Sequence, residues 1–278
     1  MKSLFLKRLL NNKSAVIGGV IVIIVIMCAL LAPVISPYDP YTMNMPDRLQ
    51  GPGGSHLLGT DQFGRDLLTR LIYGAKVSLQ VGVIAVGLAM FVGVFLGLIA
   101  GYYGGWTDKI IMRFVDIFLA FPIILLAIAF VAALGPNTRN VMLALGMVYW
   151  TSYTRVVRSS VLSIKEEEYI MAAITTGASD IRIIFTYILP NALAPIIVMA
   201  TLGLGTAIIS ESTLSFLGLG VQPPTASWGS TLAFGLKFIR DAPYLSIFPG
   251  LAIMLTVLGF NLLGNGLRDV TDPKLTRK

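Results

Sequence analysis

Long uncharged stretches dominate the chain and alternate with short segments that carry nearly all of its charges. A helix needs about 20 mostly apolar residues to cross the hydrocarbon core of a bilayer, and most of the uncharged stretches reach that length. The pattern therefore predicts an all-α protein that crosses a lipid bilayer several times. The uncharged stretches cover residues 14–38, 77–107, 117–138, 140–154, 183–210, 212–236 and 242–267.

We predict six membrane spans. The stretch 212–236 contains Pro223-Pro224 and several Gly and Ser residues, so we assign it to the end of the fifth span and an irregular loop. The spans cover approximately residues 15–35, 77–101, 115–134, 140–161, 190–218 and 246–267. The domains expected are a cytoplasmic segment (1–14), a first span with an external loop (15–76), a core (77–267) and a cytoplasmic tail (268–278).

The distribution of basic residues predicts the orientation. With six spans, fourteen of the 21 Lys and Arg residues fall on the side that holds both termini and residues 155–189. Cytoplasmic loops carry the excess of Lys and Arg, so this side is predicted to face the cytoplasm. The same bias explains the net charge of +7, because the basic residues flank apolar stretches. Binding of nucleic acid is not expected.

Composition agrees with a membrane protein and narrows the possible chemistry. Charged residues make up 13% of the chain, whereas soluble domains carry about 25%. Cys28 is the only cysteine, which excludes an intrachain disulfide. His56 is the only histidine and cannot form a His/Cys metal cluster alone. The sequence therefore gives no reason to expect a metal site or an enzyme.

The segment 163–190 is a polar, helix-forming insert between two apolar stretches. Ser163 and Glu166 fit the capping box S-x-x-E at a helix start. Glu166, Glu167 and Glu168 then fall in the first turn, where the helix dipole favours negative charge. Gly177 suits the left-handed turn that ends a helix. The insert is thus predicted to begin with a short helix that ends at an elbow.

A second helix is predicted to lead from the elbow into the fifth span. Ser179 or Asp180 can cap it, and Pro190 suits the first turn of the span. The Ala172-Ala173 pair gives the first helix a low-relief face that can fit a groove on a soluble partner. An interfacial linker without a partner remains the alternative.

The insert resembles the EAA loop of binding-protein-dependent ATP-binding-cassette importers. The similarity is strongest to the dipeptide/oligopeptide/nickel permease subfamily, although Met171 and Tyr187 stand at the usual Glu and Ile positions. It implies a type I importer transmembrane domain whose cytoplasmic loop is a coupling helix that docks on an ATPase. The residues that carry the resemblance and the implied coupling role are Glu168, Tyr169, Ala172, Ala173, Gly177, Ala178, Ser179, Leu189 and Pro190.

The loop before the second span resembles the corresponding segment of C-type permease subunits. Thr60 or Asp61 is expected to cap a helix at the outer interface, with Asp66 and Arg70 as an i,i+4 ion pair. A catalytic Asp61/Asp66 pair is conceivable, but no nucleophile or metal cluster accompanies it, so the structural interpretation is preferred. The apolar edge of this helix would consist of Leu67, Leu68, Leu71 and Ile72.

The segments 211–229 and 265–273 also resemble this family. Glu211 lies near the outer end of the fifth span, where a charge is costly unless it faces protein or water. With Ser212 and Ser215 it is a candidate for the translocation path or the outer gate. A snorkelling or paired interfacial carboxylate is the alternative.

Other charged residues near the spans receive simpler interpretations. Arg155 and Arg158 are interpreted as anchors at the inner interface. Arg113 and Asp116 are predicted to form a local pair at the entrance to the third span.

The chain contains no G-x-x-x-x-G-K-[ST] loop, so ATP and Mg are expected on separate subunits. The resemblance implies a second homologous permease in a heterodimer, two cytoplasmic ATPases and an external solute-binding protein, in a prokaryotic plasma membrane. Short peptides are the expected solutes, with nickel or metal chelates as the alternative. An ion-coupled secondary transporter that uses Glu211 or Asp116 and a scaffold subunit are the rival hypotheses.

Overall fold

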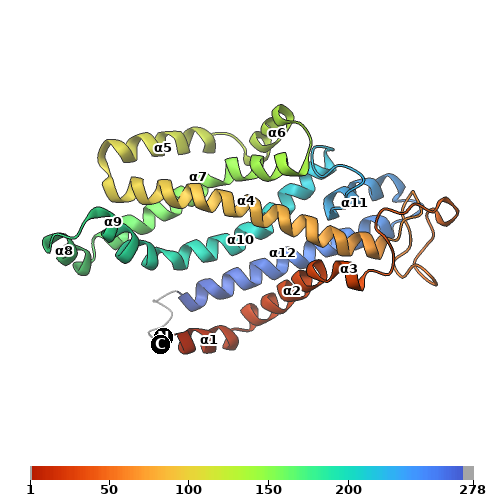
Figure 1. Cartoon of the computed structure of the whole chain (residues 1–278), viewed down its shortest axis with the longest axis horizontal. Coiled ribbons are helices and arrows are strands. Elements are labelled where there is room, and N and C mark those ends of the chain that lie inside the picture. Colours follow the sequence, from red (N-terminus) through yellow and green to blue (C-terminus); the bar gives the residue numbers. More distant parts are fainter. Residues whose placement is uncertain (1, 272–278) are drawn as a thin grey trace.

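The computed structural model describes residues 2–271, and its regular elements are helical (Figure 1). The α-helices are α1 (Lys2–Asn11), α2 (Lys13–Leu30), α3 (Ala32–Ile35), α4 (Leu67–Tyr103), α5 (Gly105–Leu119), α6 (Ile123–Leu134), α7 (Thr138–Lys165), α8 (Glu168–Thr175), α9 (Asp180–Arg182), α10 (Leu189–Phe216), α11 (Trp228–Gly235) and α12 (Tyr244–Thr271). Short 3₁₀ turns cover Met45–Asp47 and Leu236–Phe238, and a π-helical turn covers Ile183–Ile188.

Most of the predicted spans are present as long apolar helices. Within residues 2–271, four segments are long and apolar enough to cross a membrane, namely α2, α4, Asp180–Phe216 and α12, and the bent pair α5–α6 raises the number to five. The fourth predicted span (140–161) corresponds to α7, which has 28 residues but carries more polar side chains. Many of these polar groups pack inside the protein, including Thr151 and Thr154, so the outer surface of α7 does not have to be uniformly apolar.

The second span, α4, is longer than predicted. It includes the helix that was expected to lie separately at the outer interface before residue 77. Asp66 caps α4 by accepting a hydrogen bond from the Thr69 N–H at 2.8 Å. From there the helix continues for 37 residues, about 55 Å at 1.5 Å per residue. The prediction of Thr60 or Asp61 as the cap was wrong, because the Asp61 carboxylate accepts from the backbone of its own loop at Phe63 and Arg65.

The third span is broken. α5 begins at Gly105 rather than near residue 115, and α5 and α6 meet at an angle of 88°. The break falls at Pro122, whose ring and missing N–H disfavour a continuous helix. Among the described residues, Asp116 bonds to Arg155 at 2.7 Å rather than to Arg113. The predicted local pair was therefore wrong.

Ion pairs hold α5 to α7. Besides the Arg155–Asp116 pair, Arg158 forms a bidentate pair with Asp108, in which the Nη2–Oδ2 distance is 2.6 Å. The two arginines join helices, so the interpretation of Arg155 and Arg158 as interface anchors missed their partners.

Glycines bring α4 and α7 into close contact. A Cβ atom at Gly97 would lie 2.7 Å from the Val157 Cβ, and one at Gly101 would lie 2.6 Å from the Val161 Cβ. Real Cβ contacts are longer than this, so only glycine permits the observed spacing of the two helices. Gly93, Gly97 and Gly101 recur every four residues and therefore form one seam on the helix.

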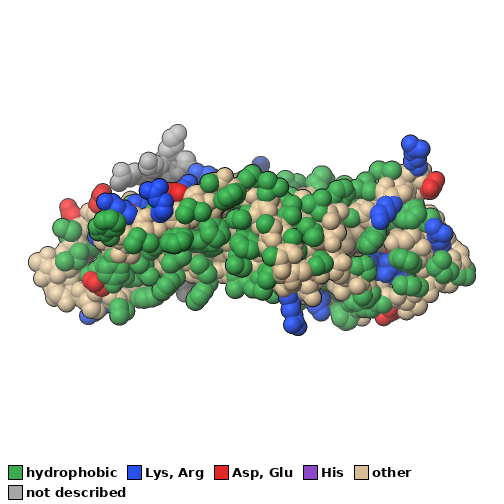
Figure 2. All heavy atoms as spheres, turned by 90° about the horizontal axis from the view of Figure 1, so that it is seen from above, with side chains coloured by type: hydrophobic (Ala, Val, Ile, Leu, Met, Phe, Trp, Pro, Cys, Tyr) green, Lys and Arg blue, Asp and Glu red, His purple; other side chains and the backbone are tan. Residues whose placement is uncertain are grey.

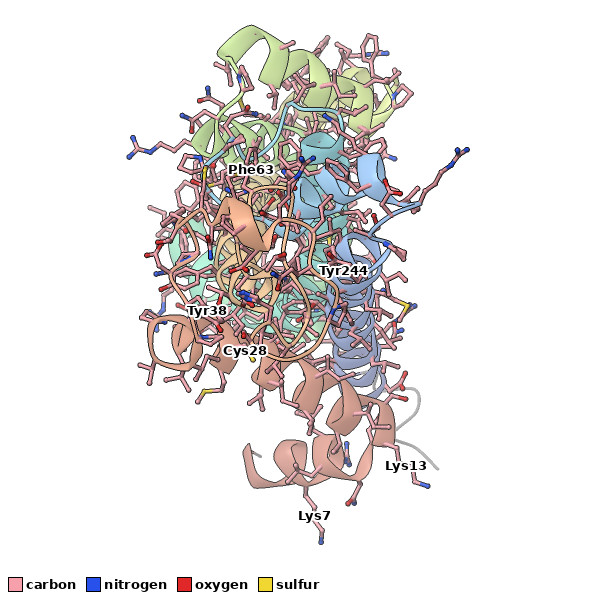
Figure 3. All side chains as sticks on the ribbon, turned by 90° about the vertical axis from the view of Figure 1, so that its right-hand side faces the viewer. Lys7, Lys13, Cys28, Tyr38, Phe63 and Tyr244 are labelled. Carbon is pink, nitrogen blue, oxygen red and sulfur yellow. The ribbon has the colours of Figure 1, made fainter. Side chains whose placement is uncertain are left out.

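The two ends of the molecule differ in structure. α1, α8 and the end of α12 lie at one end, and the long loop 36–66 lies with α11 at the other (Figure 1). Charged side chains gather mainly toward these ends, with a largely apolar surface between them (Figure 2). Figure 3 views the molecule from the loop end, with Tyr38, Phe63 and Tyr244 labelled. Among the described residues, α1, the end of α12 and the insert helix α8 therefore lie at the same end (Figure 1).

The loop end has more regular structure than expected. Residues 228–235 form α11, which the prediction of an irregular loop missed. Ser227 caps the helix by a capping box with Ser230, a pairing that the S-x-x-E pattern does not include. The Tyr244 hydroxyl donates a hydrogen bond to the Gln50 carbonyl oxygen at 2.8 Å. This bond links the loop 36–66 to α12.

Candidate functional site

The insert 163–190 forms the predicted helix, elbow and second helix, but its first helix begins later than expected. α7 continues to Lys165, and α8 begins at Glu168 with Glu167 as a cap that makes no side-chain bond. The capping box of Ser163 and Glu166 is therefore absent. Ser163 lies inside the last turn of α7, where its backbone carbonyl accepts from the Glu166 N–H.

Gly177 forms the elbow as predicted. Its φ angle is +78°, and nothing lies within 4 Å of where a Cβ would be, so the backbone conformation explains the glycine. The Ala178 N–H bonds to the Ala173 carbonyl and the Gly177 N–H to the Ile174 carbonyl, each at 3.0 Å. These two bonds form a Schellman motif, which closes the end of α8.

The second helix runs directly into a membrane span, as predicted. Ser179 precedes it without a side-chain cap, and the Asp180 carboxylate instead accepts a hydrogen bond from another helix. The π-helical turn follows, in which the Leu189 N–H bonds to the Ile184 carbonyl. Pro190 comes next and lacks an N–H, so the wider turn accommodates its ring.

The helix α8 has one buried face and one exposed face. Ile170 and Ala173 are buried against the apolar ends of α4, α7 and the π-helical turn. Ala172 is exposed, so the predicted Ala172-Ala173 pair is divided between the two faces. The exposed face also carries large apolar side chains, with exposed fractions of 43% for Tyr169, 58% for Met171 and 45% for Ile174.

The exposed face is chemically suited to bind protein. Large apolar side chains on a solvent-facing helix mark an interaction surface when they lie next to one another. Partial burial raises the pKa of Tyr169 above its ordinary value, with a smaller contribution from Glu167. Its phenol is a hydrogen-bond donor at neutral pH with or without this shift. Glu168 adds an exposed carboxylate in the first turn of the helix.

A polar contact ties the insert to two spans. Tyr102, near the end of α4, donates a hydrogen bond to Asp180 at 2.7 Å. Lys165, at the end of α7, donates to the Tyr102 carbonyl at 2.6 Å. We call Tyr102, Lys165 and Asp180 the inner tie. Sequence reasoning missed it, because the partners lie 63 and 78 residues apart and no local pattern connects them.

Glu211 is enclosed by protein. Its exposed fraction is 0%, and its carboxylate accepts hydrogen bonds from Ser215 at 2.7 Å and from Ser78 of α4 at 3.3 Å. The snorkelling interpretation was therefore wrong. Ser215 also accepts from the Val221 N–H at 3.1 Å, and Ser212 is buried beside Gly229.

Trp228 joins α11 to α4 at the same place. Its indole N–H donates to the Leu71 carbonyl at 2.9 Å, and its ring lies against Gly74, where a Cβ would approach to 3.0 Å. Its backbone N–H lies 3.4 Å from the Ser78 Oγ. The segments around Glu211 and Trp228 thus meet in one buried contact. We call Ser78, Glu211, Ser212, Ser215 and Trp228 the outer cluster.

The charged residues of the outer loop stabilise its folding. Asp61 pairs with Arg65 at 2.7 Å and with Arg70 at 3.4 Å, whereas Asp66 bonds to His56 at 3.0 Å. The predicted Asp66–Arg70 pair was therefore wrong. Asp66 is held by the N-terminus of its own helix, so Arg70 turns to Asp61. Within residues 2–271, no group of three or more His, Cys, Asp or Glu residues could hold a metal ion.

The architecture defines a class, namely a multi-pass helical membrane protein with a helical insert between two spans. Residues 93–277 match the family described as binding-protein-dependent transport system inner membrane component, and the chain belongs to this family. Residues 3–52 match the N-terminal transmembrane domain of oligopeptide transport permease C. The recognition made from the insert and the outer segments is thereby confirmed.

Curated relatives cover nearly the whole chain. A dipeptide transport system permease protein DppC of Alkalihalophilus pseudofirmus is 53% identical over 269 residues, which are 97% of this chain and 88% of that protein. A di/tripeptide transport system permease protein DppC of Pseudomonas aeruginosa is 44% identical, with 95% and 89% covered. A glutathione transport system permease protein GsiD of Pectobacterium atrosepticum is 45% identical, with 98% and 90% covered.

Proposed function

We propose that this chain is the C-type permease subunit of an ATP-driven importer for short peptides, and that it forms half of the translocation pathway. Family membership supports a transport role, and the three relatives are named for dipeptide, di/tripeptide and glutathione transport. Each of these names specifies a short peptide, which favours peptides over nickel or metal chelates. The same comparisons argue against an ion-coupled secondary transporter and against a scaffold.

The exposed apolar face of α8 carries the proposal for coupling. Tyr169, Met171, Ala172 and Ile174 face solvent at the end of the molecule that also holds α1 and the end of α12. Positive-inside bias assigns this end to the cytoplasm. We infer that an ATPase subunit covers this face, while Ile170 and Ala173 fix α8 to the spans.

The chain itself contains no phosphate-binding loop, so ATP and Mg belong to the ATPase subunits. A complete transporter on this scheme has a second, homologous permease subunit in a heterodimer and two ATPases. A solute-binding protein delivers peptides to the opposite end, where the loop 36–66 and α11 lie. The inner tie then carries movements of the insert to α4 and α7.

Substitution at Ala172 tests the docking surface. A Trp at this exposed position adds bulk to the face that the ATPase covers, so Ala172→Trp should prevent co-purification of the ATPase with the permease. Thr107→Trp adds the same bulk at an exposed position at the start of α5, outside the insert, and should leave the complex intact. Retention of the ATPase by the Ala172 variant at wild-type stoichiometry contradicts the proposed surface.

A further inference from the structure

A cavity of about 220 Å³ opens between α6, α7 and α10, and the proposed function does not account for it. It lies near the middle of α7 and of α10, which contact each other along this part of the bundle. Among the described residues that line it, there is no Lys, Arg, Asp, Glu or His. The lining residues are Ile123, Tyr149, Ser152, Tyr153, Met199, Leu202, Gly203 and Thr206.

Hydroxyl groups from two helices meet at this cavity. On α7, Tyr149, Ser152 and Tyr153 follow the i, i+3, i+4 spacing of one helix face. The Tyr149 hydroxyl bonds to Ser210 of α10 at 2.7 Å. Thr206 is one turn before Ser210 and is exposed. The two helices therefore place several hydroxyls on a wall that is otherwise mostly apolar.

Gly203 makes room for this arrangement. A Cβ at this position would lie 2.5 Å from the Tyr153 hydroxyl oxygen, which is too close for a side chain. With glycine there, the Tyr153 hydroxyl approaches the α10 backbone and lies 3.4 Å from the Met199 carbonyl oxygen. The tyrosine is held at the wall rather than pointing into the opening.

Two hydroxyl groups of the wall, those of Ser152 and Thr206, remain available for hydrogen bonds to a solute. Ser152 is half-buried, and within the described part of the chain its hydroxyl has no hydrogen-bond partner. Thr206 has only a 3.4 Å contact with the Leu202 carbonyl. Hydroxyls at the middle of a span lose free energy when they face lipid, because the hydrocarbon offers no partner. A surface in contact with water or a polar solute suits them.

We propose that this cavity is a contact site for the transported solute and that it binds the main chain of a short peptide through neutral hydrogen bonds. A hydroxyl both donates and accepts, so the wall can pair with peptide N–H and C=O groups alike. Because the wall is uncharged, we expect it to bind peptides with acidic and with basic side chains with similar affinity. This inference rests on the proposed function as a peptide importer.

The test uses the complete transporter, with its ATPases and solute-binding protein, in proteoliposomes. Thr206→Val removes one hydroxyl while keeping the shape, and Thr206→Ser keeps the hydroxyl. One hydrogen bond contributes about 1 kcal/mol, so Thr206→Val should lower transport kcat/KM about fivefold while Thr206→Ser lowers it less than about twofold. The pair Ser152→Ala and Ser152→Thr should behave in the same way.

The solutes are Ala-Ala, Ala-Glu and Ala-Lys. We expect the same fold decrease for all three in Thr206→Val. Unchanged transport in both Thr206→Val and Ser152→Ala overturns the inference, and so does a decrease confined to one charge class. A wild-type transporter that moves none of these peptides instead defeats the proposed function itself, so the two failures are distinguishable.

Cysteine labelling supplies a second readout that does not depend on turnover. In a Cys28→Ser background, Ser152→Cys should react with a water-soluble maleimide and should be protected by Ala-Ala. Met147→Cys lies on the opposite side of the same helix, where Met147 is 47% exposed, and should show no protection. Equal reactivity of both cysteines, with protection of neither, contradicts a solute site at this cavity.

Discussion

Glu211 shows how one buried charge can organise the outer end of the molecule. Serines from two helices bond to its carboxylate, and the adjoining α11 bonds to α4 through Trp228. A carboxylate without solvent contact needs such partners, because transfer of an unpaired charge from water is costly. We propose that Glu211, with Ser212 and Ser215, holds the outer gate of the pathway closed in this conformation.

The variant Glu211→Gln tests this gate. A glutamine keeps the shape, but its NH₂ group cannot accept the hydrogen bond that one carboxylate oxygen accepts now. The loss should weaken the closed outer end by about 1–3 kcal/mol. We expect peptide uptake to fall several-fold and ATP hydrolysis to lose its stimulation by the solute-binding protein.

Asp241→Asn is the matched control, since Asp241 is an exposed carboxylate at the same end and outside the outer cluster. It should leave uptake and ATP hydrolysis unchanged. If Glu211→Gln also leaves both unchanged, the gate hypothesis fails and the cluster has a purely structural role.

Individual residues were predictable where the cause of their conformation is local. The elbow at Gly177 follows from its positive φ, which glycine tolerates best, and the sequence pattern was sufficient to place it. The capping box at Ser163 failed because a Ser and a Glu three residues apart also fit inside a helix. Nothing in the local sequence indicates that the preceding helix continues to Lys165.

At the scale of helices, the inner tie connects three elements that are separate in sequence. Tyr102 of α4 contacts Lys165 of α7 through its carbonyl and Asp180 of the second insert helix through its hydroxyl. The buried face of α8 packs against the same helix ends. A displacement of the insert is therefore transmitted to α4 and α7 through both polar and apolar contacts.

Tyr102→Phe should loosen this connection. The substitution keeps the ring that packs against the cluster but removes the bond to the Asp180 carboxylate, which we estimate at about 1–2 kcal/mol for this partly exposed position. The expected result in proteoliposomes is more ATP hydrolysed per peptide transported, with the ATPase still bound. An unchanged ratio would exclude a coupling role for this hydroxyl.

Tyr103→Phe provides the comparison. Tyr103 is adjacent, is 54% exposed, and its ring lies 5.2 Å from that of Tyr102. The variant removes a phenol hydroxyl from the same helix end without touching the inner tie. Its ratio of ATP hydrolysed to peptide transported should equal that of the wild type.

The elements that sequence patterns located best are those with uninterrupted apolar runs. The spans α2, α10 and α12 follow directly from length and the absence of charge. The break at Pro122 and the start of α4 at Leu67 have local causes, namely the proline and the Asp66 cap, which a prediction from the length of apolar runs does not take into account. The ion pairs of α5 with α7, by contrast, involve partners distant in sequence, whose proximity is visible only in the folded chain.

At the scale of the whole molecule, the arrangement of the two ends was predictable and the detailed path between them was not. Counting basic residues placed both termini and the insert on one side, and the structure groups α1, α8 and the end of α12 together. Asn12 and Asp269 bond at 3.2 Å near that end. The cavity between α6, α7 and α10 was not predicted, because its residues resemble ordinary packing positions when each helix is considered alone.

The most direct measurement labels a cysteine placed at Ala172, in a Cys28→Ser background, with a membrane-impermeant maleimide. We predict no labelling in intact cells, strong labelling in inverted membrane vesicles, and protection in those vesicles when the ATPase subunits are bound. Labelling from outside intact cells would contradict a cytoplasmic insert and, with it, the proposed coupling to an ATPase.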